Sequence, residues 1–150
     1  MPAVPYCRKR ALTMESAVVA KIRHLAIAVP DPERAAEFYE KVFGLKRVGH
    51  TESPLATGVY LSDGTFNLAL LNYKTDAAAG EERGRHYIGT HHFGFIVDDL
   101  DSARKEIEAN GGVFFLDLPE HKDTLYYEQK YRDPDGIIFD ISQQGWVGTK

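Results

Sequence analysis

The sequence predicts an α+β protein built from two consecutive modules of the same kind, each a strand, a helix and three further strands. Two observations lead to this prediction. A strand-like run followed by helical spacing begins near residue 21, and the same order returns 68 residues later. The 150 residues are 43% hydrophobic and 27% charged, which is ordinary for a globular domain. Such a chain can bury a core without disulfides or a structural metal, so a metal found here would serve function.

The first module begins with an apolar, β-branched run over residues 21–29, which predicts a buried strand. Asp31 then suits an N-cap, Pro32 the first helical position and Gly44 the residue after the helix. Apolar residues between them recur at helical spacing, so one stripe of this helix should be buried. Three more strands are predicted over residues 45–50, 58–61 and 66–71, the last two joined by a turn at Ser62-Asp63-Gly64.

The second module follows a polar, alanine- and glycine-rich segment at residues 72–85, which indicates a linker or mobile loop. Aligning residues 92–112 with residues 24–44 matches strand with strand and helix with helix. The identical pairs include His24 with His92, Val29 with Val97, Asp31 with Asp99, Ala35 with Ala103 and Gly44 with Gly112. Asp63-Gly64 also recurs as Asp135-Gly136, so the second module again has the order β-α-β-β-β.

These patterns predict a single domain over residues 20–143, made of modules 20–73 and 89–143 joined by a linker at residues 74–88. Residues 1–19 are expected to form a flexible tail, and residues 144–150 a second tail. Met14 leaves open whether translation starts there or at Met1. Cys7 is the one cysteine, so no disulfide can form within a chain, which suits a reducing cytoplasm.

Charge and hydropathy argue against two classes of partner. The net charge is −4, and the one basic run is Arg8-Lys9-Arg10, so a nucleic-acid partner is not expected. No apolar run approaches the length of a membrane span, and the N-terminus lacks the apolar core of a signal peptide. We therefore expect a cytoplasmic protein with no membrane partner.

Two histidines and an aspartate lie at corresponding places in the predicted strands. Side chains alternate along a strand, so His24 shares a face with Ala26 and Ala28. His92 begins the equivalent set in the second module, and Asp140 lies between Ile138 and Ser142 on one face of the last strand. A single histidine in a strand is more often a surface or core residue than a ligand. The recurrence of His24 as His92 instead favours a 2-His-1-carboxylate metal site with open coordination positions.

The sequence resembles the vicinal oxygen chelate superfamily, which includes glyoxalases (lactoylglutathione lyase), methylmalonyl-CoA epimerases, extradiol dioxygenases, fosfomycin-resistance transferases and bleomycin-binding proteins. The resemblance covers residues 21–143 and depends on three stretches: RHLAIAVPDPERAAEFYEKVFGL, HHFGFIVDDLDSARKEIEANGG and RDPDGIIFDIS. It implies a glyoxalase/dihydroxybiphenyl dioxygenase-like fold, in which two βαβββ modules form a curved mixed sheet with one cleft. A metal in that cleft chelates two adjacent substrate oxygens, Asp140 matches the third ligand, and a homodimer is expected.

The chain departs from the family pattern at three positions. Lyases and epimerases usually take a fourth ligand from the fourth strand, where this chain has Ala69. Asn67 lies on the same face but ~7 Å along the strand, which makes it a poor substitute. Ring-cleaving enzymes usually carry a tyrosine where this chain has Lys130, and Asp140 replaces the usual glutamate. The missing carboxylate at Ala69 disfavours proton-shuttling lyase or isomerase chemistry.

Tyr126, Glu128 and Lys130 share one face of the predicted seventh strand and are the candidate catalytic residues. Lys130 and Glu128 beside a divalent ion could act as acid and base, with the lysine pKa lowered by the cation and by burial. A cross-strand ion pair at the sheet rim is the alternative. We expect Asp133-Pro134-Asp135-Gly136 to form only a turn.

The remaining histidines and several aromatic residues are assigned non-catalytic places. His91 should point away from His92 and be structural, whereas His50, His86 and His121 default to solvent, with His86 alone able to support a ligand. Tyr60, Phe114 and Phe115 are expected in the core rather than around a substrate.

The leading hypothesis is a metal-dependent, dioxygenase-like enzyme that acts on a small molecule with vicinal oxygens. His24, His92 and Asp140 would hold one divalent ion, with Fe²⁺ or Mn²⁺ favoured and Zn²⁺ or Ni²⁺ as alternatives. A glyoxalase-like lyase or isomerase is the first alternative, with Glu128 or Lys130 as its base. A non-catalytic, bleomycin-resistance-like protein that binds a small molecule in the same cleft is the second.

Overall fold

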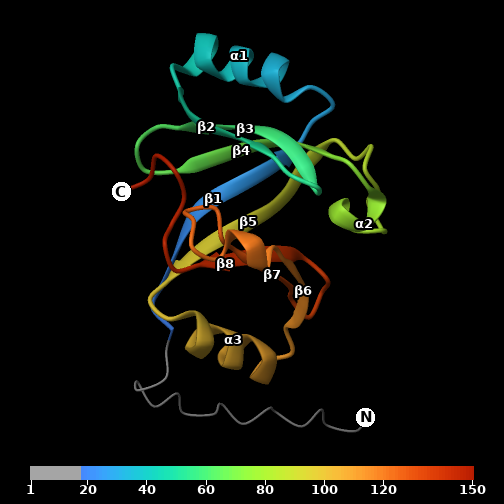
Figure 1. Ribbon diagram of the computed structural model, residues 1–150, viewed down its shortest axis with the longest axis vertical. Helices are drawn as coiled ribbons and strands as arrows, with labels where there is room; N and C mark the ends of the chain where they lie inside the picture. The colour runs from blue at the N-terminus through green and yellow to red at the C-terminus, as the bar shows by residue number, and fades with distance from the viewer. Residues whose placement is uncertain (1–17) are drawn as a thin grey trace, which may run out of the picture.

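A computed structural model describes residues 18–150, which form one eight-stranded sheet with helices outside it (Figure 1). The expectations for Cys7, Met14 and the basic run at residues 8–10 lie outside the described residues. The first module comprises β1 (Ala20–Ala28), α1 (Pro32–Phe43), β2 (Lys46–Glu52), β3 (Ala56–Ser62) and β4 (Asn67–Tyr73). The second comprises β5 (Gly89–Val97), α3 (Leu100–Ala109), β6 (Val113–Asp117), β7 (Gln129–Arg132) and β8 (Ile138–Ser142), with α2 (Asp76–Ala79) before it and a short 3₁₀ turn at Pro119–His121.

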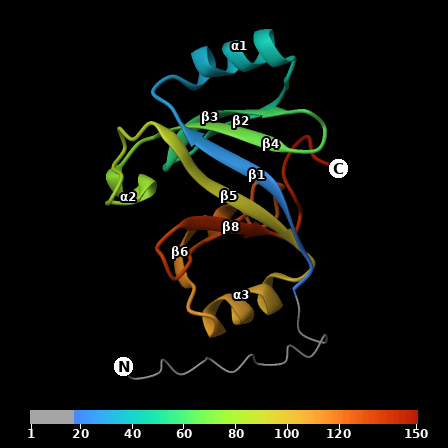
Figure 2. The same cartoon turned by 180° about the vertical axis from the view of Figure 1, so that it is seen from behind.

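The strand order β2-β3-β4-β1-β5-β8-β7-β6 confirms the α+β class and the paired βαβββ modules. In each module the first strand pairs in parallel with the last, β1 with β4 and β5 with β8. The modules meet where β1 and β5 pair antiparallel in the middle of the sheet. Helices α1 and α3 lie at opposite ends of the molecule, each over its own module's strands (Figures 1 and 2). The central strand pair therefore brings equivalent positions of the two modules together.

Both long helices begin as the sequence predicts. The Asp31 carboxylate accepts a hydrogen bond from the Arg34 amide at 3.0 Å, and the Asp99 carboxylate accepts one from the Ser102 amide at 2.7 Å. Gly44, with φ of 70°, adopts the left-handed conformation that ends α1. No helix among residues 18–150 is long and apolar enough to cross a membrane.

The segment between the modules is more ordered than the predicted mobile loop. It contains α2, whose Ala78 and Ala79 are buried in a cluster with Ala26, Ala28 and neighbouring residues of β4. The Thr75 hydroxyl accepts a hydrogen bond from the Ala78 amide at 3.1 Å and caps this short helix. The small alanine side chains allow α2 to pack closely against the sheet. The polar residues on both sides of these alanines make the segment look like a loop in the sequence.

A β-bulge in β5 overturns the prediction that His91 points away from His92. Ala26 pairs with His92 and Ile27 pairs with Thr90, so His91 is an extra residue in β5. The bulge interrupts the alternation of side chains, and the Nδ1 atoms of His91 and His92 lie 2.8 Å apart. Strict two-residue alternation therefore fails where β5 shifts its register against Ala26 and Ile27 of β1.

Gly94 on β5 has no side chain, which leaves room for the Asp140 carboxylate and the Trp146 ring. A Cβ atom at this position would lie 2.1 Å from Asp140 Oδ1 and 2.5 Å from the Trp146 ring. Trp146 belongs to the segment at residues 144–150 that the sequence suggests is a tail, yet it is only 8% exposed. The C-terminal segment thus packs against the sheet, and Gly94 is required for that packing.

Replacing Gly94 with alanine is expected to destabilise the protein by roughly 3 kcal/mol, because neither backbone-anchored Asp140 nor the Trp146 ring can move away without strain. Chemical denaturation measures this change. Gly64→Ala is the control, since a Cβ atom at Gly64 would meet no other atom within 4 Å, and the φ of 95° alone should cost ~1 kcal/mol. Equal losses in the two variants would contradict the packing argument.

Candidate metal centre

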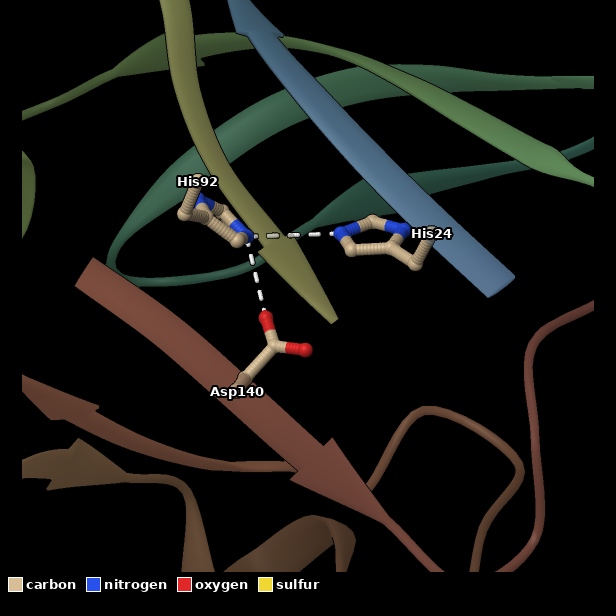
Figure 3. A group of neighbouring side chains, drawn as sticks. All are labelled: His24, His92 and Asp140. Atoms are coloured by element: carbon tan, nitrogen blue, oxygen red, sulfur yellow. Dashed lines mark hydrogen bonds and ion pairs between the residues drawn. The ribbon is translucent and has the colours of Figure 1, made fainter. Parts of the chain in front are cut away.

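His24 on β1, His92 on β5 and Asp140 on β8 converge at the centre of the sheet (Figure 3). Their exposed fractions are 3%, 2% and 0%. The two Nε2 atoms lie 3.3 Å apart, and His92 Nε2 lies 3.0 Å from Asp140 Oδ2. The structure therefore brings together the three residues that the sequence suggests as ligands.

Asn67 fixes the protonation of His24. Its Nδ2 group donates a hydrogen bond to the Val147 carbonyl at 2.9 Å, which leaves its Oδ1 atom facing His24 Nδ1 at 3.1 Å. An amide oxygen only accepts hydrogen bonds, so His24 Nδ1 carries a proton, and in the neutral imidazole His24 Nε2 then presents a lone pair. Asn67 is thus a support for a ligand rather than a ligand.

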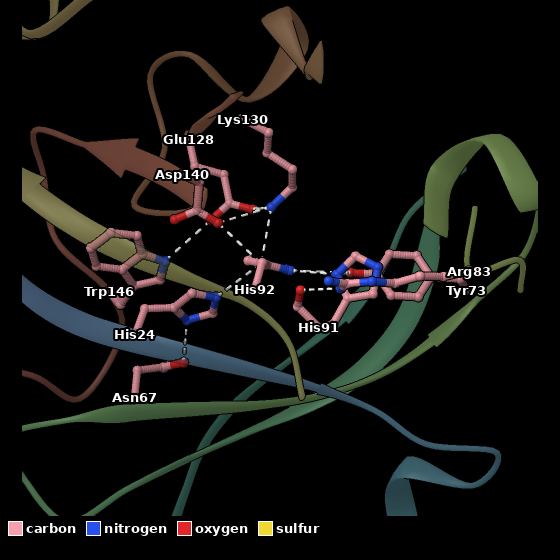
Figure 4. Close-up of polar contacts among 10 residues, drawn as sticks. All are labelled: His24, Asn67, Tyr73, Arg83, His91, His92, Glu128, Lys130, Asp140 and Trp146. Atoms are coloured by element: carbon pink, nitrogen blue, oxygen red, sulfur yellow. Dashed lines mark hydrogen bonds and ion pairs between the residues drawn. The ribbon is translucent and has the colours of Figure 1, made fainter. Parts of the chain in front are cut away.

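His91 and Tyr73 fix the protonation of His92 in the same way (Figure 4). His91 Nε2 donates to the Ala79 carbonyl at 2.7 Å, so its Nδ1 atom is an acceptor that faces His92 Nδ1. The Tyr73 hydroxyl lies 3.1 Å from His91 Nδ1 and 3.4 Å from His92 Nδ1. Burial lowers the pKa of His91 to about 4, which keeps this imidazole neutral. His92 therefore carries its proton on Nδ1 and presents Nε2 to the site.

Three hydrogen-bond acceptors consequently face one another, and neither imidazole places a hydrogen between them. The 3.3 Å and 3.0 Å separations join two Nε2 lone pairs and a carboxylate oxygen, an arrangement that a cation would stabilise. Donor atoms about 3.0 Å apart match neighbouring positions of an octahedral ion with bonds of about 2.1 Å. Asp140 Oδ1 is also buried without a hydrogen-bond partner. The donor set thus fits a divalent metal ion.

Strand register explains why one side of this centre has no ligand. Asp140 pairs with Gly94, two residues after His92, and Ala69 pairs with Ala26, two residues after His24. Ala69 is therefore the first-module counterpart of Asp140, and its methyl group cannot bind a metal. The centre has three donors and an open side toward Ala69.

Lys130 extends into the centre from β7. Its Nζ atom lies 2.9 Å from Asp140 Oδ2 and 3.1 Å from His92 Nε2, and it also pairs with Glu128 (Figure 4). Burial alone would lower the pKa of Lys130, but the Asp140 and Glu128 carboxylates outweigh burial and raise it. The decrease expected for a lysine beside a divalent ion remains a prediction for the metal-loaded protein, since without the ion the two carboxylates set the opposite direction. The ion pair is also buried rather than at the sheet rim, with Lys130 only 8% exposed.

Trp146 is the site residue that sequence reasoning missed. Its indole stacks on the His24 imidazole, with ring centroids 5.0 Å apart and planes 7° apart, and its Nε1 group donates to Glu128 Oε2 at 3.2 Å. The one signal in the sequence is that the only tryptophan follows the last strand so closely. Apart from this tryptophan, residues 144–150 are mostly polar or glycine, and such a composition does not predict a segment that packs over a buried site.

Two adjoining hollows open from the centre and share Tyr60, Leu71, Tyr126 and Glu128. The inner hollow reaches His24, His92 and Ala69, and the outer one is bounded by Leu55, Leu116 and Leu118. Tyr126 stacks on Tyr60 with ring centroids 5.7 Å apart. Tyr60 thus lines the cleft, so its assignment to the core alone is wrong.

The other assigned residues lie outside the centre. His121 lines the outer hollow, whereas His50 and His86 are exposed, and His86 contacts Arg85 rather than a ligand. Phe114 is 50% exposed, which overturns its assignment to the core. The Asp133 carboxylate accepts hydrogen bonds from the amides of Asp135 and Ile137, which is the predicted turn.

The fold and the centre define a class of protein in which two βαβββ modules enclose a three-donor site. The sequence model of the Glyoxalase/Bleomycin resistance protein/Dioxygenase superfamily matches residues 21–141, and the chain belongs to this superfamily. No curated protein matches the chain.

Solved structures share the fold at low sequence identity. A methylmalonyl-CoA epimerase variant of Streptomyces coelicolor is 21% identical with a TM-score of 0.66, covering 80% of this chain and 94% of its own. The epimerase of Mycobacterium tuberculosis is 17% identical with a TM-score of 0.65, covering 87% and 91%. A hypothetical protein of Bacillus halodurans C-125 is 21% identical with a TM-score of 0.63, covering 81% and 92%.

Replacing Asn67 with leucine should weaken divalent-metal binding by roughly 10- to 100-fold, because His24 would lose the acceptor that orients it. Isothermal titration of metal-free protein with Mn²⁺ and Zn²⁺ measures this effect. Asn72→Leu is the matched control on β4, since Asn72 donates only to the Val29 and Pro30 carbonyls. An Asn67→Leu protein with wild-type affinity would show that this amide does not support the ligand.

Proposed function

We propose that this protein is a divalent-metal-dependent enzyme that acts, in a dioxygenase-like reaction, on a small molecule with two adjacent oxygens. The observation that supports the proposal is the set of three buried acceptors on His24, His92 and Asp140, open on the side of Ala69. A three-donor set leaves coordination positions for a chelating substrate and a further small ligand. A fourth protein ligand would occupy one of these positions.

His24, His92 and Asp140 would hold the ion in this proposal, with Fe²⁺ or Mn²⁺ favoured and Zn²⁺ or Ni²⁺ as alternatives. When bound, the ion would polarise the adjacent substrate oxygens and, if it is iron or manganese, support chemistry with O₂. Asn67 and His91 would keep both imidazoles in the protonation state that a ligand needs. The C-terminal segment, through Trp146, would limit access of water to His24.

Lys130, Glu128 and Tyr126 are the proposed catalytic residues. The Lys130 ammonium, next to the donor atoms, would donate a hydrogen bond to a substrate oxygen. Glu128 would hold Lys130 in position beside the substrate. Tyr126 and Tyr60 line both hollows, so together they would form an aromatic wall beside a planar substrate.

An isomerase or lyase is the second candidate, favoured by the fold likeness to methylmalonyl-CoA epimerases. Such a reaction needs a free base. Glu128 has one oxygen bonded to Lys130 and the other to Trp146, so the side chain best placed for this role is already engaged. A non-catalytic binding protein is the third candidate, favoured by the Lys130 cation among the donor atoms. We also propose a cytoplasmic homodimer, in line with the superfamily resemblance.

Protein purified without chelator or histidine tag should contain about one divalent ion per chain, and His92→Ala should contain none, because one of the three donors is removed. Elemental analysis measures this content, followed by anaerobic reconstitution with Fe²⁺ or Mn²⁺. The iron- or manganese-loaded protein should consume O₂ with a catechol. Methylmalonyl-CoA and the hemithioacetal of methylglyoxal and glutathione test the isomerase and lyase alternatives.

His50→Ala is the control, since His50 is an exposed histidine of β2 away from the centre. It should retain wild-type metal content and activity. Metal binding without O₂ consumption would reject the dioxygenase-like reaction and leave the isomerase or lyase and the non-catalytic binding protein as candidates. No metal uptake by wild-type protein on reconstitution would reject a metal-dependent enzyme.

A further inference from the structure

The Lys130 ammonium touches two of the three atoms that a metal ion would need. Its Nζ atom lies 2.9 Å from Asp140 Oδ2 and 3.1 Å from His92 Nε2. An ammonium group has three hydrogens to donate, and here Asp140, His92 and Glu128 accept them. Lys130 is therefore a fully paired cation in the space between the donors, and it offsets the repulsion among their lone pairs.

A divalent ion bound to the same lone pairs could not coexist with this arrangement. His92 Nε2 has a single lone pair, so a metal that binds it removes one of the three acceptors of the Lys130 ammonium. Two positive charges a few ångströms apart in a buried site also repel strongly. The cation of the chain and the cation from solution thus require the same atoms.

We propose that Lys130 is an internal competitor of the metal: its ammonium holds His92 and Asp140 together in the metal-free protein and withdraws when a divalent ion binds. This inference rests on the proposed metal site. Lys130 is here a positioning residue that sets metal affinity, in addition to the substrate contact proposed for it.

Glu128 provides the place to which the ammonium withdraws. It already pairs with Lys130 through Oε1, while its Oε2 atom accepts a hydrogen bond from Trp146 Nε1 at 3.2 Å. The carboxylate is thus held on the cleft side of Lys130, where the hollows begin. Rotation of the flexible lysine stem can release Asp140 and His92 while the ion pair with Glu128 stays intact.

The first test compares the affinity of wild-type protein and Lys130→Met for Zn²⁺ and Mn²⁺ by isothermal titration. Methionine keeps an unbranched apolar stem of similar length and removes the charge. We expect Lys130→Met to bind each ion at least tenfold more tightly. Lys41→Met is the matched control: Lys41 is an exposed residue of α1 paired with Glu37, and its loss changes net charge equally without altering affinity.

The second test uses wild-type protein alone and therefore does not depend on whether the variant folds. Lysine-selective ¹H–¹⁵N spectra follow the Lys130 ammonium during titration with diamagnetic Zn²⁺. A buried, fully hydrogen-bonded ammonium should give a resolved signal in metal-free protein, and this signal should shift in proportion to the bound metal. The signals of Lys41 and the other surface lysines should stay unchanged.

The outcomes separate this inference from the proposed function. Tighter binding by Lys130→Met together with a shifted ammonium signal supports competition. If wild-type protein binds metal as tightly as Lys130→Met does, Lys130 does not compete with the metal. Metal binding by wild-type protein without a change in the Lys130 signal has the same meaning. In both cases the inference about Lys130 is wrong, and the proposed metal site is still supported. Failure of wild-type protein and Lys130→Met alike to bind either ion overturns the inference and the metal site together.

Discussion

The convergence of three buried acceptors at the junction of the two modules is the constraint on which the rest of the site depends. The Nε2 atom of His92 lies 3.3 Å from His24 Nε2 and 3.0 Å from a carboxylate oxygen of Asp140, and neither imidazole places a hydrogen between these atoms. Such contacts are unfavourable unless a cation is present. They persist because the Lys130 ammonium pairs with His92 and Asp140, while Asn67 and His91 hold the two imidazoles from behind. The antiparallel pairing of β1 with β5 fixes the distance between them.

The two modules are alike in fold but differ in chemistry, and this difference defines the open side of the centre. Each supplies one histidine from its first strand, yet the position that is Asp140 in the second module is Ala69 in the first. Ala69 has only a methyl group and Gly94 has no side chain, so both positions leave space that larger residues would fill. The Trp146 ring occupies the space beside Gly94. The Lys130 ammonium supplies a positive charge beside the same donors. The centre therefore has three donors, one open side and one internal cation because the two modules, alike in fold, carry different residues at a few corresponding positions.

Local patterns in the sequence sufficed for the fold and for the three donors. The 68-residue repeat matched His24 with His92, and the caps at Asp31 and Gly44 fixed the first helix. What the sequence could not give depended on contacts between distant segments. The bulge at His91 is set by strand register across β1 and β5, and the stacking of Trp146 on His24 joins the two ends of the described chain. The pKa of Lys130 likewise depends on two carboxylates that only folding brings to it.

The protonation state of the two imidazoles is the property of this centre to measure first. Long-range ¹H–¹⁵N spectra of metal-free protein at neutral pH distinguish a protonated Nδ1 from a protonated Nε2 on each histidine. The hydrogen-bond network predicts a proton on Nδ1 of both His24 and His92, with the lone pair on Nε2 facing the centre. A proton on Nε2 of either histidine would instead place a hydrogen between the acceptors. That result would contradict the claim that the centre is built to receive a cation.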